Sequence, residues 1–352
     1  MSEVTAGARP TLEAVAARAG VSRATVSRVV NGGTGVRPAL VERVRLAVEE
    51  LGYVPNHAAR SLVTRRNGAV AVIIAEPELR IFTDPYFAQQ IRGISRELTA
   101  HDSQLVLLWA EGAEDFERIS RYLTGGHVDG ALAFSVHNDD ELPSAIRNAR
   151  VPAVFGGRPG WPGAAHEPPV PYIDADNRGG AREAVRHLVS LGRTRIAHIA
   201  GPADLTSATD RFDGYRDVLL DPDPALLAEG DFTEAGGAAA MSLLLTRAPD
   251  LDAVFAASDL MAAGALRVLR EEGRRVPEDV ALVGFDDMVQ VAEATDPPLT
   301  TVRQDIEGMG RLMVRLLMRM LDQDAADVAG EPGSRAPGSV ITPTELVRRA
   351  SA

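Results

Sequence analysis

The feature that most restricts the fold of this 352-residue chain is the alternation, from Ala69 onward, of short apolar runs with longer amphipathic segments. Short apolar runs bounded by turn-forming residues are typical of buried strands, and apolar residues at helical spacing indicate helices. Strands that alternate with helices predict doubly wound parallel sheets with helices on both faces. The strand candidates are Ala69–Ala75, Leu105–Trp109, Gly130–Phe134, Ala153–Phe155, Ile196–Ala200, Ala253–Ala257 and Val280–Gly284, and the helical segments include "FAQQIRGISRELTA", "NRGGAREAVRHLVSLG" and "LMAAGALRVLREEG".

A Pro/Gly-rich segment, "GGRPGWPGAAHEPPVP", interrupts this pattern at residues 156–171. Such a segment indicates a passage between two α/β lobes. We expect one lobe to comprise roughly residues 68–165 and 293–322, and the other roughly residues 166–292 and 323–352. Ligands bind at the carboxyl ends of strands in such sheets, so the cleft between the lobes is the expected binding site.

Residues 1–54 are predicted to form a separate all-α unit of three short helices. Gly20 ends the first helix, and the Ser22 hydroxyl group can cap the second. Pro38 suits the first turn of the third helix, which stops at Gly52. The residues expected to face the interior are Leu12, Val15, Ala16 and Ala19, then Val26, Val29 and Val30, and then Val41, Val44, Val48 and Leu51.

A helix, a Gly turn and a second helix with a polar outer face form a helix-turn-helix pattern. The second helix of such a pattern enters the DNA major groove, where Arg donates a pair of hydrogen bonds to guanine. A small solvated bundle without a partner is the alternative interpretation of these helices. The polar face carries Arg23, Ala24, Ser27, Arg28 and Asn31.

Charge is divided unevenly along the chain. Residues 1–66 hold 10 Arg and 5 Asp or Glu, a net charge of +5, and the remainder holds 27 Arg and 44 Asp or Glu, a net charge of −17, which together give −12. A basic head on an acidic body suggests that the head meets a polyanion and that the body does not.

Several classes of protein are disfavoured by the sequence. The chain contains no cysteine, so a disulfide framework, a Cys-based zinc site and a thiol nucleophile are excluded. We expect no secretory signal and no membrane span, because no apolar run has the required length, and therefore a cytoplasmic protein. No Walker loop, G-x-S-x-G elbow or metal-spaced histidine pair occurs, which favours binding over catalysis and predicts no cofactor and no metal.

The segments "TLEAVAARAGVSRATVSRVVNG" and "VRPALVERVRLAVEELGYVPNHAARSL" resemble the headpiece of the lac repressor/gal repressor (LacI/GalR) family of bacterial transcription regulators. The body resembles the periplasmic-binding-protein-like core of the same family, on segments such as "DPYFAQQIRGI", "IDADNRGGAREAVRHLVSLGRTRIAHIAGP" and "VPEDVALVGFDD". The resemblance implies a transcriptional repressor that binds a pseudo-palindromic DNA operator as a homodimer. It further implies control by a small effector, a mono- or oligosaccharide such as a glucobiose.

The resemblance also implies a hinge helix at residues 55–67 that orders on DNA, with Leu62 as a wedge between base steps in the minor groove. Ordinary packing of a linker is the alternative role for Leu62. The residues that the pattern and the resemblance assign to DNA binding are Thr11, Ser22, Arg23, Ala24, Thr25, Ser27, Arg28, Asn31, Asn56, His57, Ala59 and Leu62.

Carrying the family's effector site onto this sequence gives carboxylates, Arg and aromatic rings. Carboxylates and Arg can form paired hydrogen bonds with vicinal hydroxyl groups, and an aromatic ring covers the apolar face of a pyranose. We expect a neutral sugar, since an acidic cleft would repel anions. Ser258 stands where several sugar-responsive members have Asn, and Gly157 where some have Asp, so Arg158 can contribute instead. The predicted effector-binding residues are Asp84, Phe87, Arg158, Asp176, Ser207, Arg211, Phe232, Ser258 and Asp286.

Each of these residues also has a purely structural alternative. Asp286 can cap a turn, Arg211 can form a structural ion pair, and Phe232 can belong to the core. Two other functions stay open at this point. One is a corepressor-type regulator that responds to a nucleobase-like ligand, and the other is a sugar-processing enzyme fused to a DNA-binding head.

Overall fold

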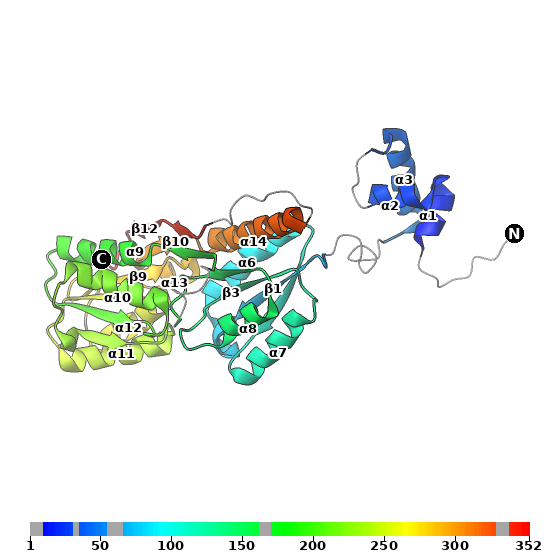
Figure 1. The fold of residues 1–352 in the computed structure, drawn as a ribbon. Helices are drawn as coiled ribbons and strands as arrows, with labels where there is room; N and C mark the ends of the chain where they lie inside the picture. Colours follow the sequence, from blue (N-terminus) through cyan, green and yellow to red (C-terminus); the bar gives the residue numbers. More distant parts are fainter. Residues whose placement is uncertain (1–9, 31–34, 55–65, 162–169, 329–337) are drawn as a thin grey trace. The chain divides into compact units, whose positions relative to one another are not determined.

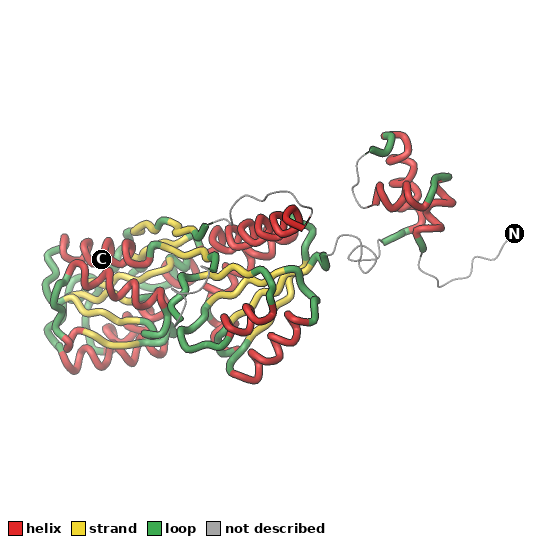
Figure 2. The backbone as a smooth tube through the Cα atoms, viewed as in Figure 1, coloured by secondary structure: helices red, strands yellow, loops and turns green. Residues whose placement is uncertain are grey.

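The computed structural model describes residues 10–30, 35–54, 66–161, 170–328 and 338–352. The chain divides into two compact units, Met1–Gly68 and Ala69–Ala352, called here the head and the core. The described part of the head is helical, whereas the core mixes helices and strands (Figures 1 and 2). None of the helices described is both long and apolar enough to span a membrane.

The head consists of α1 (Leu12–Ala19), α2 (Arg23–Val30) and α3 (Pro38–Leu51). Gly20 ends α1 in the left-handed conformation, at φ 62°, and a Cβ atom there would lie 2.6 Å from Nη2 of Arg43. The Arg43 side chain lies against this turn, because its Nη2 donates to the Ala19 carbonyl oxygen at 2.5 Å. The Ser22 hydroxyl oxygen accepts from the Thr25 backbone N–H at 3.2 Å, which confirms the predicted cap. The buried core of the head comprises Val15, Ala16, Ala19, Val26, Val44, Ala47 and Tyr53.

The first lobe of the core is built on a six-stranded sheet with the order β11-β5-β4-β3-β1-β2. Its strands are β1 (Ala69–Ile74), β2 (Gln104–Trp109), β3 (Gly130–Phe134), β4 (Ala153–Gly156), β5 (Tyr172–Ala175) and β11 (Val340–Thr342), all parallel to their neighbours. Alternate residues of β1 face opposite sides of the sheet, as a strand requires. Val70 and Val72 pack against α6 (Pro85–Ala100) and α14 (Ile306–Val328). Ala71 and Ile73 pack in a cluster with α7 (Ala113–Thr124) and α8 (Leu142–Ala149), and a further short helix, α5 (Glu78–Thr83), follows β1.

The second lobe has another six-stranded sheet, with the order β12-β10-β9-β8-β6-β7. Its strands are β6 (Ile196–Ala200), β7 (Leu227–Glu229), β8 (Ala253–Ala256), β9 (Ala281–Asp286), β10 (Thr300–Gln304) and β12 (Thr344–Val347). The edge strand β12 runs antiparallel to β10, whereas the other pairs are parallel. The helices are α9 (Asn177–Ser190) and α10 (Thr206–Val218) in one apolar cluster, α11 (Glu234–Arg247) and α12 (Asp259–Glu271) in the other, the 3₁₀ turn η1 (Pro224–Leu226), and α13 (Val289–Ala292).

The described chain passes between the lobes three times: from β5 to α9, from β10 to α14 and from β11 to β12. The expected lobe boundaries are therefore wrong for three strands, because β5 and β11 belong to the first sheet and β10 to the second. Local apolar patterns identify a strand, but they contain no information about which of two sheets it joins. The predicted two-lobe α/β core with parallel sheets is confirmed, and the edge strand β12 is the antiparallel strand among those described.

Candidate effector site and DNA-binding helix

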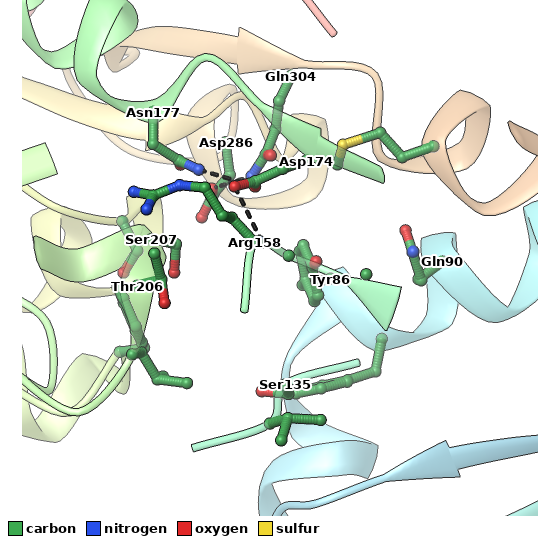
Figure 3. Close-up of a pocket in the computed structure, with 18 of the residues that line it drawn as sticks. Tyr86, Gln90, Ser135, Arg158, Asp174, Asn177, Thr206, Ser207, Asp286 and Gln304 are labelled. Atoms are coloured by element: carbon green, nitrogen blue, oxygen red, sulfur yellow. Dashed lines mark hydrogen bonds between the residues drawn. The ribbon is translucent and has the colours of Figure 1, made fainter. Parts of the chain in front are cut away.

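A cavity lies between the two lobes, where the carboxyl ends of strands from both sheets meet. It holds about 930 Å³ of space not occupied by atoms, its open mouth included. Figure 3 shows Asn177, Arg158, Asp174, Asp286 and Gln304 gathered on one side of it, with Gln90 on the opposite side.

Arg211 is the centre of the polar group in the cavity, and its side chain is 6% exposed. Its Nε donates to Oδ1 of Asn177 at 2.9 Å, and its Nη1 donates to the Ala257 carbonyl oxygen at 2.5 Å. Its Nη2 lies 3.3 Å from Oδ1 of Asp286, which also accepts from Nε2 of Gln304 at 2.6 Å. Arg211 from α10 is thus fixed by residues of three other segments before any ligand arrives.

Asp286 lies at the end of β9 with φ at 108°, a left-handed conformation that is unusual outside glycine. Burial raises the pKa of its carboxyl group to about 7, although the Arg211 guanidinium opposes that rise and Asp84 adds to it. A carboxyl group with a pKa in this range can donate or accept a hydrogen bond near neutral pH.

Asp174 and Asn177 line the cavity, whereas the predicted Asp176 does not. Asp176 is exposed and caps α9, because its Oδ1 accepts from the Gly179 N–H at 2.9 Å. Asp174 is buried and accepts from the Arg158 N–H at 3.1 Å and from Nδ2 of Asn177 at 3.0 Å, and burial raises its pKa. Asp176 lies outside the cavity because β5 ends at Ala175 and α9 begins at Asn177, which turns successive side chains in different directions.

Aromatic residues and a second arginine form the remaining walls. Phe87 on α6 stacks on Phe134, with ring centroids 6.2 Å apart. Phe232 has φ at 65° and lies with its ring 5.8 Å from the Arg211 guanidinium carbon and 5.4 Å from that of Arg80. Burial raises the pKa of the neighbouring Tyr86 phenol, so this group stays neutral at physiological pH.

The other predicted effector residues also line the cavity, and two of them cap helices. Oδ1 of Asp84 accepts from the Tyr86 N–H at 2.9 Å, and burial raises the pKa of Asp84. The Ser258 hydroxyl oxygen accepts from the Met261 N–H at 3.2 Å. The predicted residues that the structure brings together at the cavity are Asp84, Phe87, Arg158, Ser207, Arg211, Phe232, Ser258 and Asp286.

Arg158 has a partner of its own. Its Nη2 lies 2.5 and 2.6 Å from the two carboxylate oxygens of Asp210 on α10. Because Arg158 follows β4 of the first lobe, this ion pair joins the lobes at the edge of the cavity.

The expectation of an acidic cleft is wrong. The lining contains three arginines, Arg80, Arg158 and Arg211, and three carboxyl groups, Asp84, Asp174 and Asp286. The formal charges of these six residues cancel, so the cavity lining as a whole does not repel anions. The preference for a neutral ligand has to rest on the hydrogen-bonding groups instead.

Sequence reasoning missed several lining residues. Gln304 ends β10, so its position at a strand end was an available signal, and Thr206 adjoins the predicted Ser207. The others depend on how the lobes meet and have no local signal. The missed residues are Arg80, Gln90, Ser135, Val136, Phe155, Gly156, Trp161, Ile173, Asp174, Asn177, Leu205, Thr206, Met288, Gln304 and Met309.

The second helix of the head presents its predicted polar face to solvent. Arg23, Ala24 and Arg28 are exposed, and Nε of Arg23 lies 3.0 Å from Oε1 of Glu13 on α1. Thr11 caps α1 and Ser22 caps α2, and the Ser22 and Thr25 hydroxyl oxygens lie 2.9 Å apart. Asn31, Asn56, His57, Ala59 and Leu62 lie outside the described residues, as does most of the predicted hinge 55–67. Ser27, which is partly buried, is the remaining predicted residue of α2.

No group of His, Asp and Glu side chains suited to a metal ion is present in the described ranges. Arg211, Asp286, Asn177 and Gln304 bond to one another at the cavity. The arrangement can hold and orient a ligand that offers several hydroxyl groups beside an apolar face.

Two family descriptions match this chain. Residues 11–56 match "Bacterial regulatory proteins, lacI family", and residues 185–352 match "Periplasmic binding protein-like domain". The HTH-type transcriptional regulator CelR of Thermobifida fusca is 52% identical over 315 residues, which is 88% of this chain and 91% of that protein. The ribose operon repressor of Escherichia coli K12 is 33% identical over 318 residues, which is 89% of this chain and 93% of that protein.

Solved structures agree with these similarities. A complex described as "transcriptional regulator CelR-cellobiose complex" has a TM-score of 0.75 and 47% identity, and the match covers 98% of this chain and 100% of that one. The lac repressor dimer bound to operator and the anti-inducer ONPF has a TM-score of 0.80 and 29% identity, with 98% and 99% of the two chains covered.

Proposed function

Because this chain belongs to the lacI family of bacterial regulatory proteins and is a DNA-binding regulator of transcription, we propose that it represses its target genes as a homodimer. A small sugar in the interlobe cavity controls its affinity for the operator. The chain acts in the cytoplasm, where chromosomal DNA is accessible, and carries out no reaction on the sugar.

The observation that carries the sugar assignment is the group around Arg211, in which Asp286, Asn177 and Gln304 are already bonded and oriented at the cavity. Charged and amide groups of this kind bind vicinal hydroxyls in pairs. Phe87 and Phe232 supply the apolar surface that a pyranose ring needs. Similarity to a regulator solved with cellobiose supports a glucose disaccharide as the effector.

Helix α2 is the recognition helix that contacts the bases of the operator. Arg23, Ala24 and Arg28 are exposed on it, and residues at these positions of a recognition helix reach base edges in the major groove. Two copies related by a twofold axis would read the two halves of a pseudo-palindromic operator.

Control of DNA binding follows from closure of the cleft. An effector that binds better to one arrangement of the lobes shifts the protein toward that arrangement, and the coupling equals the difference in its affinity for the two, typically ~1–3 kcal/mol. Sugar binding would then release the operator.

The test uses a duplex that the full-length protein selects from random DNA, measured by fluorescence anisotropy with and without cellobiose. Release of the duplex at cellobiose concentrations that saturate the protein in calorimetry is expected. Purines are titrated in parallel. Tighter DNA binding with a purine would replace the inducer assignment with a corepressor, and formation of glucose from cellobiose would contradict the absence of catalysis.

A further inference from the structure

Arg80 is a cavity residue whose guanidinium group has one buried nitrogen, Nε, without a hydrogen-bond partner among the described residues. It lies on α5, and its side chain is 14% exposed. Its Nη1 donates to Oε1 of Glu76 at 2.6 Å, whereas its buried Nε has no hydrogen-bond partner within the described ranges. A guanidinium group carries five N–H donors, and leaving such donors unsatisfied in a buried site is unfavourable. Nε has no exposed surface, but Arg80 lines the cavity, so a ligand hydroxyl oxygen there can accept from the other nitrogens of its guanidinium group.

The Arg80 guanidinium also contacts both lobes. Its central carbon lies 5.8 Å from the ring centre of Phe87 in the first lobe and 5.4 Å from that of Phe232 in the second. Cation–π contacts at such distances are attractive. The position of Arg80 therefore depends on whether the two lobes are together.

Glu76 connects Arg80 to a second contact between the lobes. Its carboxyl group is buried just after β1, and the same oxygen, Oε1, accepts from Arg80 and from the Ser135 hydroxyl group at 2.5 Å. Nε2 of His137 lies 3.4 Å from that oxygen. One carboxylate oxygen is thus shared by two cavity residues and a histidine.

His137 in turn joins the first lobe to the second. Its Nδ1 lies 2.7 Å from Oδ2 of Asp204, which belongs to the loop between β6 and α10. The backbone N–H of Asn138 donates to the Asp204 carbonyl oxygen at 3.0 Å. The residues after Asp204 are Leu205, which lines the cavity, and then α10, so this loop is also part of the ligand site.

We propose that Arg80 is an effector-binding residue and that Arg80, Glu76, His137 and Asp204, called here the Glu76 relay, couple effector binding to closure of the cleft. The inference rests on the proposed function for the identity of the effector. A ligand acceptor on Arg80 fixes the guanidinium against Glu76, and the shared oxygen then holds His137 in place for Asp204. Opening of the lobes breaks the His137–Asp204 contact, so His137, Glu76 and Arg80 are then no longer held by the second lobe through Asp204.

The first experiment is a double-mutant cycle on the full-length protein, with cellobiose affinity measured by calorimetry. Arg80→Ala is expected to weaken binding about tenfold or more. Asp204→Asn is expected to weaken it several-fold, although Asp204 does not line the cavity. The double variant is expected to lose less than the product of the two single losses, because both changes interrupt one relay.

The matched control is Asp279→Asn. Asp279 is another second-lobe carboxylate in an ion pair, but its partner Arg275, at 2.7 Å, belongs to the same lobe. Asp279→Asn is expected to leave cellobiose affinity unchanged. Unchanged affinity in Arg80→Ala would overturn the binding role, and losses that multiply in the double variant would overturn the coupling.

A second experiment measures closure without any sugar and so separates this inference from the proposed function. The chain has no cysteine, so Thr124→Cys on α7 and Thr246→Cys on α11 can carry spin labels at exposed positions. Both helices lie on the side of the core away from the crossover segments near β12 and α14 (Figure 1). Dilution with unlabelled protein restricts the measured distances to one protomer.

Asp204→Asn is expected to lengthen or broaden the distance distribution between the two labels, and Asp279→Asn to leave it unchanged. An unchanged distribution in Asp204→Asn overturns the relay. If the unmodified protein binds neither cellobiose nor any sugar of a panel, the proposed function fails, and the label distances still decide whether the relay holds the lobes together.

Discussion

Asp286 has a carboxyl group whose pKa is raised to about 7 by burial, even though Arg211 lies 3.3 Å away. Burial here outweighs an adjacent cation, because removing a carboxylate from water is expensive and Arg211 divides its donors among Asn177, Ala257 and Asp286. The bonds from Arg211 and Gln304 therefore hold the Asp286 carboxyl group in place although its burial is unfavourable.

Asp286→Asn is expected to weaken effector binding by about 2 kcal/mol, or roughly thirtyfold, because it removes the carboxyl group that exchanges hydrogen bonds with ligand hydroxyls. The matched control is Asp176→Asn, which keeps a residue that can cap α9 and lies outside the cavity. Calorimetry with cellobiose measures both. Equal affinities in the two variants would remove Asp286 from the site.

His137 makes stability depend on pH. The hydrogen bond with Glu76, and then that with Asp204, raises the pKa of the His137 imidazole to about 9. Asp140 lies beside His137, because its Oδ2 accepts from the backbone N–H of His137. A raised histidine pKa stabilises the folded state fully below the ordinary value of 6.5, and this contribution is lost as pH rises through 9.

The melting temperature should therefore fall between pH 6.5 and 9 more steeply in the unmodified protein than in His137→Gln. Thermal melting in a series of buffers measures this, with both proteins scanned at equal ionic strength. Parallel pH profiles for the two proteins would show that His137 does not titrate in this window.

The two carboxylates of "IDADN" show how far sequence reasoning reaches at this scale. The segment was predicted to supply one ligand-binding aspartate, and the cavity does receive one, Asp174 rather than Asp176. The side-chain type and the neighbourhood were predictable from the pattern. The choice between residues two positions apart depends on where the strand ends, which the apolar pattern does not define.

Among the elements, α6 and α14 are held in unusually close contact. A Cβ atom on Gly93 of α6 would collide with the backbone carbonyl of Glu307 on α14. Because α6 carries Phe87 and Gln90 to the cavity, the separation of these helices also sets the shape of the site. A helical glycine is here required by packing rather than by backbone conformation.

Gly93→Ala is expected to destabilise the core by about 1–3 kcal/mol, because the helices must move apart to admit a methyl group. Gly112→Ala is the control, since a Cβ atom there meets nothing within 4 Å and the backbone is extended. Denaturant unfolding followed by circular dichroism compares the two. A loss in Gly93→Ala no larger than that of Gly112→Ala would contradict the close contact.

Seven of the described strands could be predicted from the sequence, whereas β5, β7, β10 and β11 were not among the candidates. The apolar runs that begin at Ala69 and Gly130 coincide with β1 and β3, and the three head helices lie where their apolar stripes indicated. β7 and β11 have three residues each, too few for a pattern to develop. Such strands exist because neighbouring strands provide their hydrogen bonds, which is information from the tertiary structure.

At the scale of the whole molecule, the head and the core differ in net charge, and so do the expected salt dependences of DNA binding and sugar binding. Residues 1–66 are basic by five charges, and the remaining residues are acidic by seventeen (27 Arg and 44 Asp or Glu). Affinity that comes from contacts with phosphates falls steeply with salt, because binding releases counterions from DNA. Sugar binding by hydrogen bonds has no such dependence.

Raising salt from about 50 to 200 mM should lower operator affinity by a factor on the order of 10³, if the dimer makes about six phosphate contacts. Cellobiose affinity should change less than about twofold over the same range, since the neutral sugar releases no counterions. Anisotropy and calorimetry on one preparation measure both quantities. A flat salt profile for DNA would place binding outside the basic head.

The three passages of the chain between the lobes determine when each sheet can be completed during synthesis. The first sheet is completed by β11 and the second by β12, which together occupy residues between 340 and 347 of a 352-residue chain. A growing polypeptide can therefore fold its head early on the ribosome, but neither sheet is complete until residues 340–347 have been synthesised. A premature stop just after α14 deprives both sheets of an edge strand at once, so neither lobe of the core is completed, although the head lies in a separate unit before the stop.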